Sequence, residues 1–395
     1  MPRAGIEPAR LHQTQDFESS ASTNSATGAN GLQIYENLEF IFQIHTLHCK
    51  TQRRRLLGSE KEMNILELIN SYQQVFVVCD RNVESFARKI GDYPLLPFHA
   101  CEQNKTIDTV VSICRWLMEN GADRKALLLA VGGGTTTDVV GFAASIYKRG
   151  IAYVNIPTTL LGMIDAGVGG KTGVNLDSYK NMLGSFKLPE FIWLYPEVLR
   201  SLPHREFLSG AAEMLKTFII SDRNGSYARA VRLFSKYVSD GVSPVEKADG
   251  HQELSALIQE ASDIKQDIVE KDPFEKGDRS KLNLGHTWAH AIEWWKPGAY
   301  THGEAVAIGI IQAARKAEEL ALTQKGAAGK HGLTQKGLAD RLKEDFTACG
   351  LPTELPCAES ELLPAMRRDK KANGGSIRFV LPVSIGKVIV KSIPL

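Results

Sequence analysis

Three apolar runs separated by helix-like segments constrain the fold of this chain more than any other feature. Val75–Cys79, Ala126–Val131 and Ile151–Ile156 are short and continuously apolar, which is typical of strands buried on both faces of a parallel sheet. Thr106–Asn120 has the spacing of an amphipathic helix, and Val139–Tyr147 is also expected to be helical. The alternation of strand and helix predicts an α/β domain with a parallel sheet.

A turn of three glycines, Gly132, Gly133 and Gly134, follows the second apolar run, and Asp138 comes shortly after it. Glycines let backbone N–H groups approach a phosphate, and a helix N-terminus favours an anion. The pattern is not GxGxxG, and many strand-to-helix turns are rich in glycine for geometry alone. The turn by itself therefore leaves both interpretations open. Asp138 could complement the helix dipole or hold a hydroxyl group.

A second glycine-rich stretch, Asp165–Asn175, is followed by Lys180 and Asn181. Its Gly170–Thr172 segment is similar to the end of a P-loop. However, Asp165 stands where that motif requires its first glycine, and no strand runs into the stretch, so we exclude a P-loop. Lysines and an aspartate on glycine-rich loops suit a small anionic substrate, and an ordinary solvated loop is the alternative.

After Pro203 the pattern becomes helical. The predicted helices are Glu206–Ile220, Glu253–Val269, Leu284–Trp295, Ala305–Leu322 and Ala339–Cys349, and the predicted C-terminal strands, after a turn at Gly374–Gly375, are Ile377–Leu381 and Lys387–Val390. Residues 222–252 are interpreted as a polar excursion. Leu322–Gly326 recurs as Leu333–Gly337, which indicates a short duplication in a surface loop. The pattern predicts a second, mainly helical domain.

Histidines are concentrated in the helical part. His286 and His290 are four residues apart and would share one face of a helix. His302 follows, and Glu213 lies well upstream. Two imidazoles and a carboxylate with an open fourth position form a catalytic zinc site. A histidine pair at this spacing is more often simply packed or half-exposed, so the spacing alone does not decide between the two.

Composition excludes several classes of protein. The chain has 395 residues, long enough for two domains, and its net charge of +2 gives no reason to expect nucleic acid or an acidic membrane as a partner. No apolar run is long enough for a membrane span and no hydrophobic signal region is seen, so a cytoplasmic protein is expected. The six cysteines show no paired spacing and should be free thiols.

Residues 1–60 differ from the rest. Met1–Leu32 is rich in Ser, Thr, Asn, Ala and Gly without apolar periodicity, and it is expected to be disordered. The segment beginning at Ala4 resembles the conceptual translation of a transfer-RNA gene. Our hypothesis is that the natural protein starts near Met63.

Taken together, the motifs resemble the 3-dehydroquinate synthases, a family of sugar-phosphate cyclases. The resemblance extends from about Phe76 to Val390 and is specific, because separate motifs occur in the family's order. These motifs are Gly132–Asp138, Pro157–Leu161, Gly169–Gly173, Lys180–Asn181, Ala212–Lys216, Asn283–Glu293, His302–Val306 and Asp369–Lys371. Departures at Thr135–Thr137 and Trp288–Ala289 remove no chemical group.

The resemblance implies a Rossmann-like NAD-binding α/β domain in residues 61–202 and a mainly α-helical metal-binding domain in residues 203–395, with residues 1–60 outside both. It implies that 3-deoxy-D-arabino-heptulosonate 7-phosphate (DAHP) loses phosphate and closes to 3-dehydroquinate, the second step of the shikimate pathway. NAD would be reduced and regenerated within one turnover, with zinc or cobalt as the metal. The family also suggests a homodimer.

The resemblance also assigns residues. Glu213, His286 and His302 would hold the metal, which leaves His290 to face the substrate. Substrate groups would be Asp165, Lys171, Asn181, Lys216, Lys265, Arg279, Asn283, His290 and Lys370 or Lys371, with Arg149 reaching in from a partner subunit. NAD would be held by Asp80, Asn82, Glu102, Lys105, Gly132, Gly133, Gly134, Asp138, Thr158, Thr159, Lys171 and Lys180.

Three alternatives remain. A sibling cyclase such as 2-epi-5-epi-valiolone synthase uses sedoheptulose 7-phosphate, which lacks the carboxylate that Lys265 and Arg279 would bind. A metal-dependent polyol or glycerol-phosphate dehydrogenase would share the two-domain plan but release NADH. An inactive scaffold would have no reason to keep the metal and anion ligands.

Overall fold

The computed structural model describes residues 46–48, 65–177, 179–324, 334–368, 372–373 and 376–394. All of them belong to one compact unit, His45–Leu395. The predictions for Lys370 and Lys371, for the Gly374–Gly375 turn and for most of residues 1–60 lie outside the described residues.

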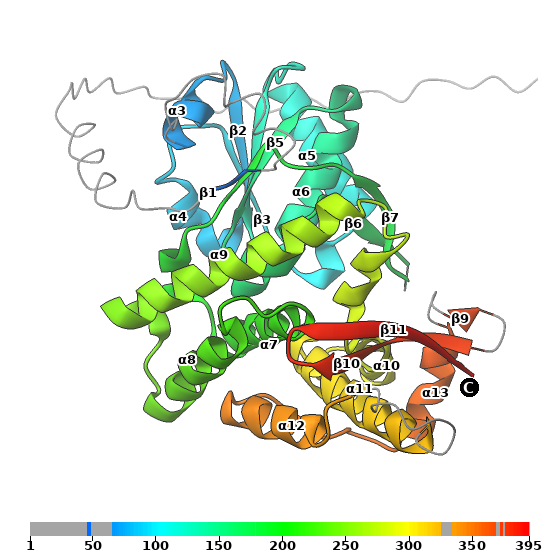
Figure 1. The fold of residues 1–395 in the computed structure, drawn as a ribbon. Coiled ribbons are helices and arrows are strands. Elements are labelled where there is room, and N and C mark those ends of the chain that lie inside the picture. The colour runs from blue at the N-terminus through cyan, green and yellow to red at the C-terminus, as the bar shows by residue number, and fades with distance from the viewer. Residues whose placement is uncertain are drawn as a thin grey trace, which may run out of the picture. The chain divides into compact units, whose positions relative to one another are not determined.

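A six-stranded sheet has the order β1-β8-β5-β4-β2-β3 (Figure 1). Its strands are β1 (Thr46–His48), β2 (Val75–Asp80), β3 (Leu95–Phe98), β4 (Leu127–Gly132), β5 (Ala152–Pro157) and β8 (Phe191–Trp193). Neighbouring strands from β3 to β8 are parallel, and β1 pairs antiparallel with β8. The predicted parallel α/β sheet is confirmed. The three residues of β1 fall within the range predicted to lie outside both domains, and for them the structure shows an edge strand instead.

Helices α5 (Ile107–Glu119) and α6 (Gly134–Ile146) lie together on one side of the sheet (Figure 1). Thr106 caps α5 by accepting a hydrogen bond from the N–H of Thr109. The predicted start of the second helix was wrong: α6 begins at Gly134, and the N–H of Thr137 already donates to the carbonyl of Gly133. The glycine turn therefore forms the helix N-terminus, because no bulky side chain blocks its first turn.

An antiparallel hairpin, β6 (Lys171–Leu176) and β7 (Tyr179–Phe186), replaces the loops predicted after Asp165. Glycines allow this pairing: a Cβ at Gly184 would lie 2.2 Å from the carbonyl oxygen of Thr172. Asp165 itself lies in η4, a single π-helical turn spanning Gly162–Ala166. Lys171, Lys180 and Asn181 are consequently presented by strands.

The rest of the described chain is mainly helical, as predicted. Its helices are α7 (His204–Ile220), α8 (Ser226–Asp240), α9 (Ala248–Lys271), α10 (His286–Trp295), α11 (His302–Gln324), α12 (Leu338–Ala348) and α13 (Glu359–Arg368). The strands β9 (Ala372–Asn373), β10 (Ser376–Ser384) and β11 (Lys387–Pro394) form a small sheet. In the earlier part of the chain, the short helices α3 (Ile65–Asn70) and α4 (Glu84–Ala87) flank β2. Short 3-10 turns include η1 (Arg81–Val83), η2 (Glu102–Asn104), η3 (Tyr147–Arg149), η5 (Pro196–Ser201), η6 (Pro244–Glu246) and η7 (Asp278–Asn283).

Helix α8 corrects the interpretation of residues 222–252 as a polar excursion. Tyr227, Ala230, Phe234 and Tyr237 are buried on one face of it. Their spacing of three and four residues is the signal that should have predicted a helix. The charged residues between them lie on the opposite face, and they gave the segment its polar composition.

Two hydrophobic cores hold these elements. One lies between the sheet and the helices α5 and α6. The other joins the helices that follow Pro203, but it also takes in Leu160, Met163 and Ile164, which lie before the boundary predicted at residue 202. This packing places η4, and therefore Asp165, against α7 and α9. Within the described ranges, no helix is long and apolar enough to cross a lipid bilayer. The five cysteines there are free thiols, as predicted.

Candidate metal and anion site

Three helices bring Glu213, His286 and His302 together. One ligand atom from each residue lies within 4.8 Å of the others. Oε1 of Glu213 is 3.9 Å from Nε2 of His286 and 3.4 Å from Nε2 of His302. Glu213 is wholly buried in α7. The three side chains form the metal cluster referred to below.

Each imidazole of the metal cluster is oriented by a second contact. Nδ1 of His286 is 3.1 Å from the carbonyl oxygen of Leu284, so Nδ1 donates a hydrogen bond there. The lone pair of Nε2 can then coordinate a metal. Nδ1 of His302 is 3.6 Å from Oε1 of Glu293, at the end of α10. Both rings therefore direct Nε2 toward the carboxylate of Glu213.

The charge of the metal cluster fits a divalent cation. Oε2 of Glu213 forms an ion pair with the ammonium of Lys216, and Oε1 faces the two imidazoles. Burial would lower the pKa of His302, but Glu213 and Glu293 outweigh it and raise that pKa to about 10. The surroundings thus favour positive charge, and one carboxylate with two imidazoles is a zinc-type ligand set.

Local sequence explains why the two histidines begin their helices. At the start of α11, Thr301 and Glu304 form a capping box: the Thr301 N–H donates to Glu304 and the Glu304 N–H donates to the Thr301 hydroxyl. At the start of α10, Gly285 has φ +80°, and a Cβ there would lie 2.9 Å from the carbonyl oxygen of Val306. The glycine lets α10 and α11 approach closely.

His290 is not part of the metal cluster. It is exposed, and its ring centroid lies 5.5 Å from that of His286. The partners that the structure supplies to His286 are Glu213 and His302, which come from other helices. Of the two histidines at i, i+4 spacing, His286 thus belongs to the metal cluster and His290 lies beside it.

Lys216 connects the metal cluster to a group of buried charges. Besides its ion pair with Glu213, its ammonium is 3.5 Å from Oδ2 of Asp165. Lys265 forms an ion pair with Oδ1 of the same aspartate. Burial would raise the pKa of Asp165, but Lys216 and Lys265 hold it well below its usual value. Burial also lowers the pKa of Lys265, and the carboxylate offsets that effect only partly.

Arg279 is the third buried cation here. Its guanidinium donates to the carbonyl oxygens of Pro273, at 2.6 Å, and Gly169, at 3.1 Å. Gly169 has φ +106°, and a Cβ there would lie 3.2 Å from the guanidinium. A cation satisfied mainly by neutral carbonyl groups keeps its charge available to an anion.

Lys171 and Asn283 meet at a residue that sequence reasoning missed, Glu275. Lys171 forms an ion pair with Oε2 of Glu275, and Nδ2 of Asn283 donates to Oε1 at 2.8 Å. No sequence signal singled out Glu275, because Asp272 and Asp278 are carboxylates in the same short stretch.

The glycine turn is closely packed at the start of α6, where backbone amide groups could bind a phosphate group. Gly133 caps this helix without a side-chain hydrogen bond, which leaves its first amide groups available. A Cβ at Gly134 would lie 2.8 Å from that of Ala166 in η4, and one at Gly133 would lie 3.0 Å from Thr159. Thr158 N–H donates to the Gly132 carbonyl, which fixes the turn against the end of β5.

Lys105 connects α6, which follows the glycine turn, to the hairpin β6–β7. Its ammonium donates to Oδ2 of Asp138 at 2.5 Å and to Oδ1 of Asn181 at 2.6 Å. Asn175, which was not predicted as a site residue, accepts from the Asn181 N–H and donates to Glu102. The predicted cofactor and substrate residues thus form one network across the hairpin.

The remaining predicted residues are less tightly connected. Asp80 caps η1 by accepting from the Asn82 N–H at the carboxyl end of β2. Lys180 forms an ion pair with Glu293 at 3.1 Å, and the carboxylate of Glu293 is also the group that orients His302. Arg149 lines a surface depression with Asp123, Arg124 and Lys148, away from the other predicted residues.

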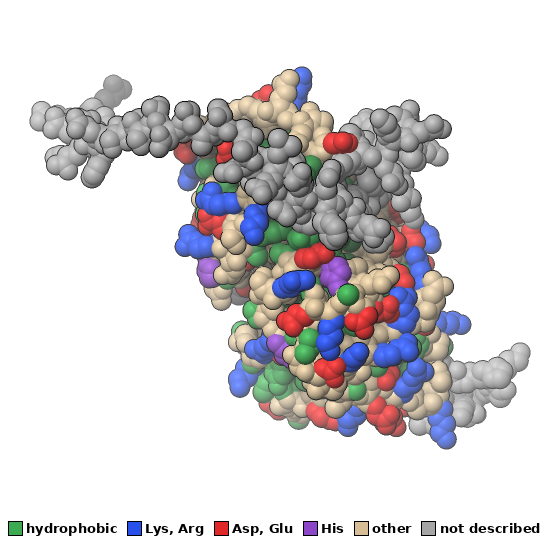
Figure 2. All heavy atoms as spheres, turned by 90° about the vertical axis from the view of Figure 1, so that its left-hand side faces the viewer, with side chains coloured by type: hydrophobic (Ala, Val, Ile, Leu, Met, Phe, Trp, Pro, Cys, Tyr) green, Lys and Arg blue, Asp and Glu red, His purple; other side chains and the backbone are tan. Residues whose placement is uncertain are grey.

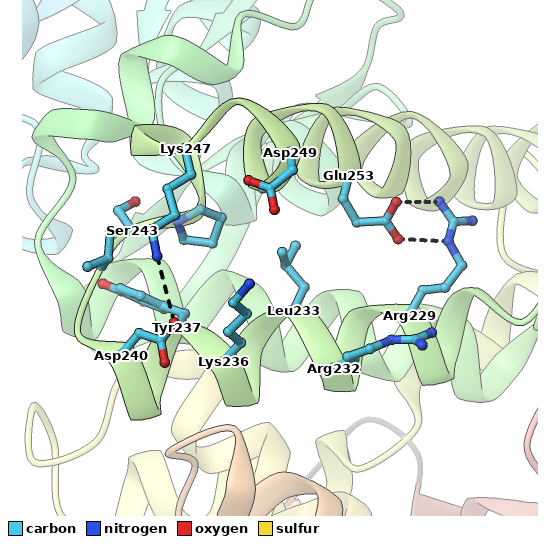
Figure 3. Close-up of a pocket in the computed structure, with 13 residues that line it drawn as sticks. Arg229, Arg232, Leu233, Lys236, Tyr237, Asp240, Ser243, Lys247, Asp249 and Glu253 are labelled. Carbon is cyan, nitrogen blue, oxygen red and sulfur yellow. Dashed lines mark hydrogen bonds and ion pairs between the residues drawn. The ribbon is translucent and has the colours of Figure 1, made fainter.

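A separate polar groove lies between α8 and α9 (Figure 3). None of the predicted site residues lines it, and Arg229 at its edge is paired with Glu253 and Glu260. Figure 2 shows acidic and basic side chains interspersed over the described part of one face of the molecule. That face has no extended basic surface of the kind that binds nucleic acid.

Comparison with known proteins gives two family matches. The family model for the 3-dehydroquinate synthase N-terminal region matches residues 95–209, and that for the C-terminal region matches residues 210–372. The 3-dehydroquinate synthase of Acidithiobacillus ferrooxidans is 40% identical over 293 residues, which cover 74% of this chain and 75% of the relative. That of Pyrococcus abyssi is 38% identical over 336 residues, covering 84% and 92%.

Solved structures show the same architecture. A 2-epi-5-epi-valiolone synthase from Streptomyces hygroscopicus with bound NAD+ and Zn2+ has a TM-score of 0.69 and 27% identity, covering 85% of this chain and 95% of its own. A 2-deoxy-scyllo-inosose synthase with carbaglucose-6-phosphate, NAD+ and Co2+ has a TM-score of 0.68 and 25% identity, covering 84% and 92%.

Proposed function

The chain belongs to the 3-dehydroquinate synthase family, and from this premise we propose that it converts DAHP to 3-dehydroquinate and phosphate. We further propose NAD and a divalent metal, zinc or cobalt, as its cofactors. The solved relatives that carry NAD+ with Zn2+ or Co2+ support this assignment.

One chain of contacts carries the proposal. Gly134 packs against Ala166, which follows Asp165 in η4. Asp165 pairs with Lys216, and Lys216 pairs with Glu213 of the metal cluster. The residues that we propose for the cofactor phosphates, the substrate and the metal are therefore contiguous, as a redox-assisted elimination from a phosphorylated sugar acid requires.

The metal cluster would hold a divalent ion, which would supply Lewis-acid polarisation of a substrate oxygen, and the glycine turn would hold NAD, which would supply reversible hydride transfer. The remaining steps use side chains. Lys265 and Arg279 would bind the substrate carboxylate, because both are buried cations facing Asp165 and Gly169. His290, exposed beside His286, would exchange a proton with the substrate.

Other parts of the proposal rest on the resemblance. Asp165, Asn181 and Asn283 would orient hydroxyl groups, and Lys171 with one of Lys370 or Lys371 would bind anionic groups. Arg149, which lies apart from the site, would act in a homodimer by reaching the partner subunit. Asp80, Asn82, Glu102, Lys105, Asp138, Thr158, Thr159 and Lys180 would complete the NAD site. A cytoplasmic enzyme of the shikimate pathway is the corresponding physiological role.

The test is to supply DAHP, NAD and zinc or cobalt to the purified protein and to measure phosphate and 3-dehydroquinate together. Equal amounts of both products, with no net NADH, are expected. Sedoheptulose 7-phosphate is supplied in parallel. Turnover of that substrate alone would identify a sibling cyclase, and accumulation of NADH would identify a dehydrogenase.

A further inference from the structure

The loop between α9 and η7 places a carboxylate of the protein itself between two predicted substrate groups. Glu275 meets the ammonium of Lys171 with Oε2 and accepts from the Asn283 amide, at 2.8 Å, with Oε1. Lys171 comes from the hairpin and Asn283 from the turn before the metal cluster. Both oxygens of this carboxylate are therefore bound by side chains that we predict to bind substrate.

The backbone of the loop is shaped to present Glu275. This residue has φ +55°, which is unusual for a residue other than glycine. The carboxylate of Asp272 accepts hydrogen bonds from the N–H groups of Lys276, Gly277 and Arg279 and so fixes the turn. Phe274 contacts Phe186 of the hairpin, with ring centroids 5.7 Å apart. The turn holds the carboxylate over the hairpin.

The charge balance indicates why a carboxylate lies there. Asp165 is shared by Lys216 and Lys265, and the guanidinium of Arg279 bonds to carbonyl oxygens. Burial would raise the pKa of Glu275, but its contacts with Lys171 and Asn283 outweigh burial and lower it, so the group is ionised at neutral pH. Its negative charge is paired with the ammonium of Lys171 and not with the two lysines that share Asp165.

We propose that Glu275 is an internal competitor for the substrate: it occupies the position of a substrate oxyanion on Lys171 and Asn283 and is displaced when substrate binds. The inference rests on the proposed function, because that function supplies a substrate with a phosphate and a carboxylate. Lys171 is suited to the exchange, since its side chain is half-exposed and flexible. Because an oxyanion must displace Glu275 to reach Lys171 and Asn283, the contact weakens the binding of an anion at this position.

The test measures oxyanion binding by calorimetry on protein loaded with NAD and zinc, so that the glycine turn is already filled. One arm titrates inorganic phosphate and the other titrates glycolate, a small hydroxy acid. Glu275→Gln removes the competing charge, and we expect it to tighten binding of one of the two anions about fivefold, the effect of a partly exposed ion pair. The arm that responds identifies which substrate group displaces Glu275.

A matched control separates this effect from net charge. Asp278→Asn removes the same charge three residues away, where the side chain is exposed and paired with Lys281, and it should leave both affinities unchanged. Glu275→Asn is a second variant, because asparagine tolerates positive φ, and it should tighten binding like Glu275→Gln. Adding Lys171→Ala to Glu275→Gln should abolish the gain.

Weaker or unchanged binding of both anions by Glu275→Gln would overturn the inference and make Glu275 a support for Lys171. Equal tightening of binding by Asp278→Asn would overturn it as well, because the gain would then come from net charge. The proposed function stands or falls separately, because it is decided by product formation from DAHP, whereas this test requires no turnover.

Discussion

The glycine turn of the sheet half and the metal cluster of the helical half differ in the kind of group that each offers to a ligand. At the turn, the absence of side chains allows close packing against Thr159 and Ala166, and the proposed binding groups are backbone amides at the start of α6. In the metal cluster, the binding groups are ionisable side chains, and Glu213 is wholly buried. One site is defined by shape and the other by charge.

This difference decides which substitutions each half tolerates. Neutral amide groups at a helix end can form hydrogen bonds with water, so the sheet half should lose little stability when no ligand is bound. A buried carboxylate needs a cation, and the protein supplies Lys216 and His302 around it. We therefore expect added atoms to weaken NAD binding in the sheet half and altered charges to weaken metal binding in the helical half.

The largest effect should come from removing charge in the metal cluster. Glu213→Gln keeps the shape of the side chain but loses the anionic ligand, so bound metal should be lost and turnover should fall by at least about 10³-fold. NAD affinity should be retained. Metal content by mass spectrometry and NAD titration check both points, with Glu206→Gln, exposed on the same helix, as control. An active, metal-free Glu213→Gln variant would contradict the site.

The corresponding change in the sheet half adds an atom. Gly134→Ala places a Cβ 2.8 Å from that of Ala166, and NAD affinity should fall on the order of 100-fold while metal content is unchanged. Adding Ala166→Gly relieves the contact within the protein. If NAD affinity then returns fully, the methyl group disturbs only packing, and the turn is not where the cofactor phosphates lie.

Glu293 tests whether charge matters beyond the direct ligands. Burial would raise its pKa, but the hydrogen bond and charge of His302, together with Lys180, lower it to about 2, so it is ionised and orients His302. Glu293→Gln should weaken zinc binding about tenfold in chelator competition. Glu319→Gln, exposed on α11 beside Lys316, should have no effect. Equal zinc affinity in both variants would remove Glu293 from the site.

The smallest effect concerns the capping box that begins α11. Glu304→Ala should lower the free energy of unfolding by about 1 kcal/mol at pH 7, since it removes the contact with the Thr301 N–H. Burial would raise the pKa of Glu304, but Arg205 and Thr301 outweigh it and lower it below 4.5. The stabilisation is thus complete above pH 4.5 and is lost as the pH falls through the lower, folded-state pKa. Urea unfolding at pH 7 and at pH 3 measures the difference, which should shrink in acid.

Much of the fold was predictable because it depends on neighbours in sequence. The buried runs Val75–Cys79 and Ala126–Val131 are strands, and the helix from Thr106 is capped by that residue. Where local signals were mixed, the prediction was wrong. Helix α8 was hidden by its charged face, and the hairpin β6–β7 was hidden by glycines that serve strand pairing.

Sequence alone predicted the central strands of the sheet and most of the helices after Pro203, and a resemblance of ordered motifs supplied the proposed site residues. Spacing alone could not choose the partners of His286, since it favoured His290; the resemblance named Glu213 and His302, and the tertiary structure brings these two side chains to it. Nor did the sequence indicate that Glu275 pairs with Lys171. Helix and strand preferences act between near neighbours, whereas the pairing of buried charges depends on which distant segments the packed cores bring together.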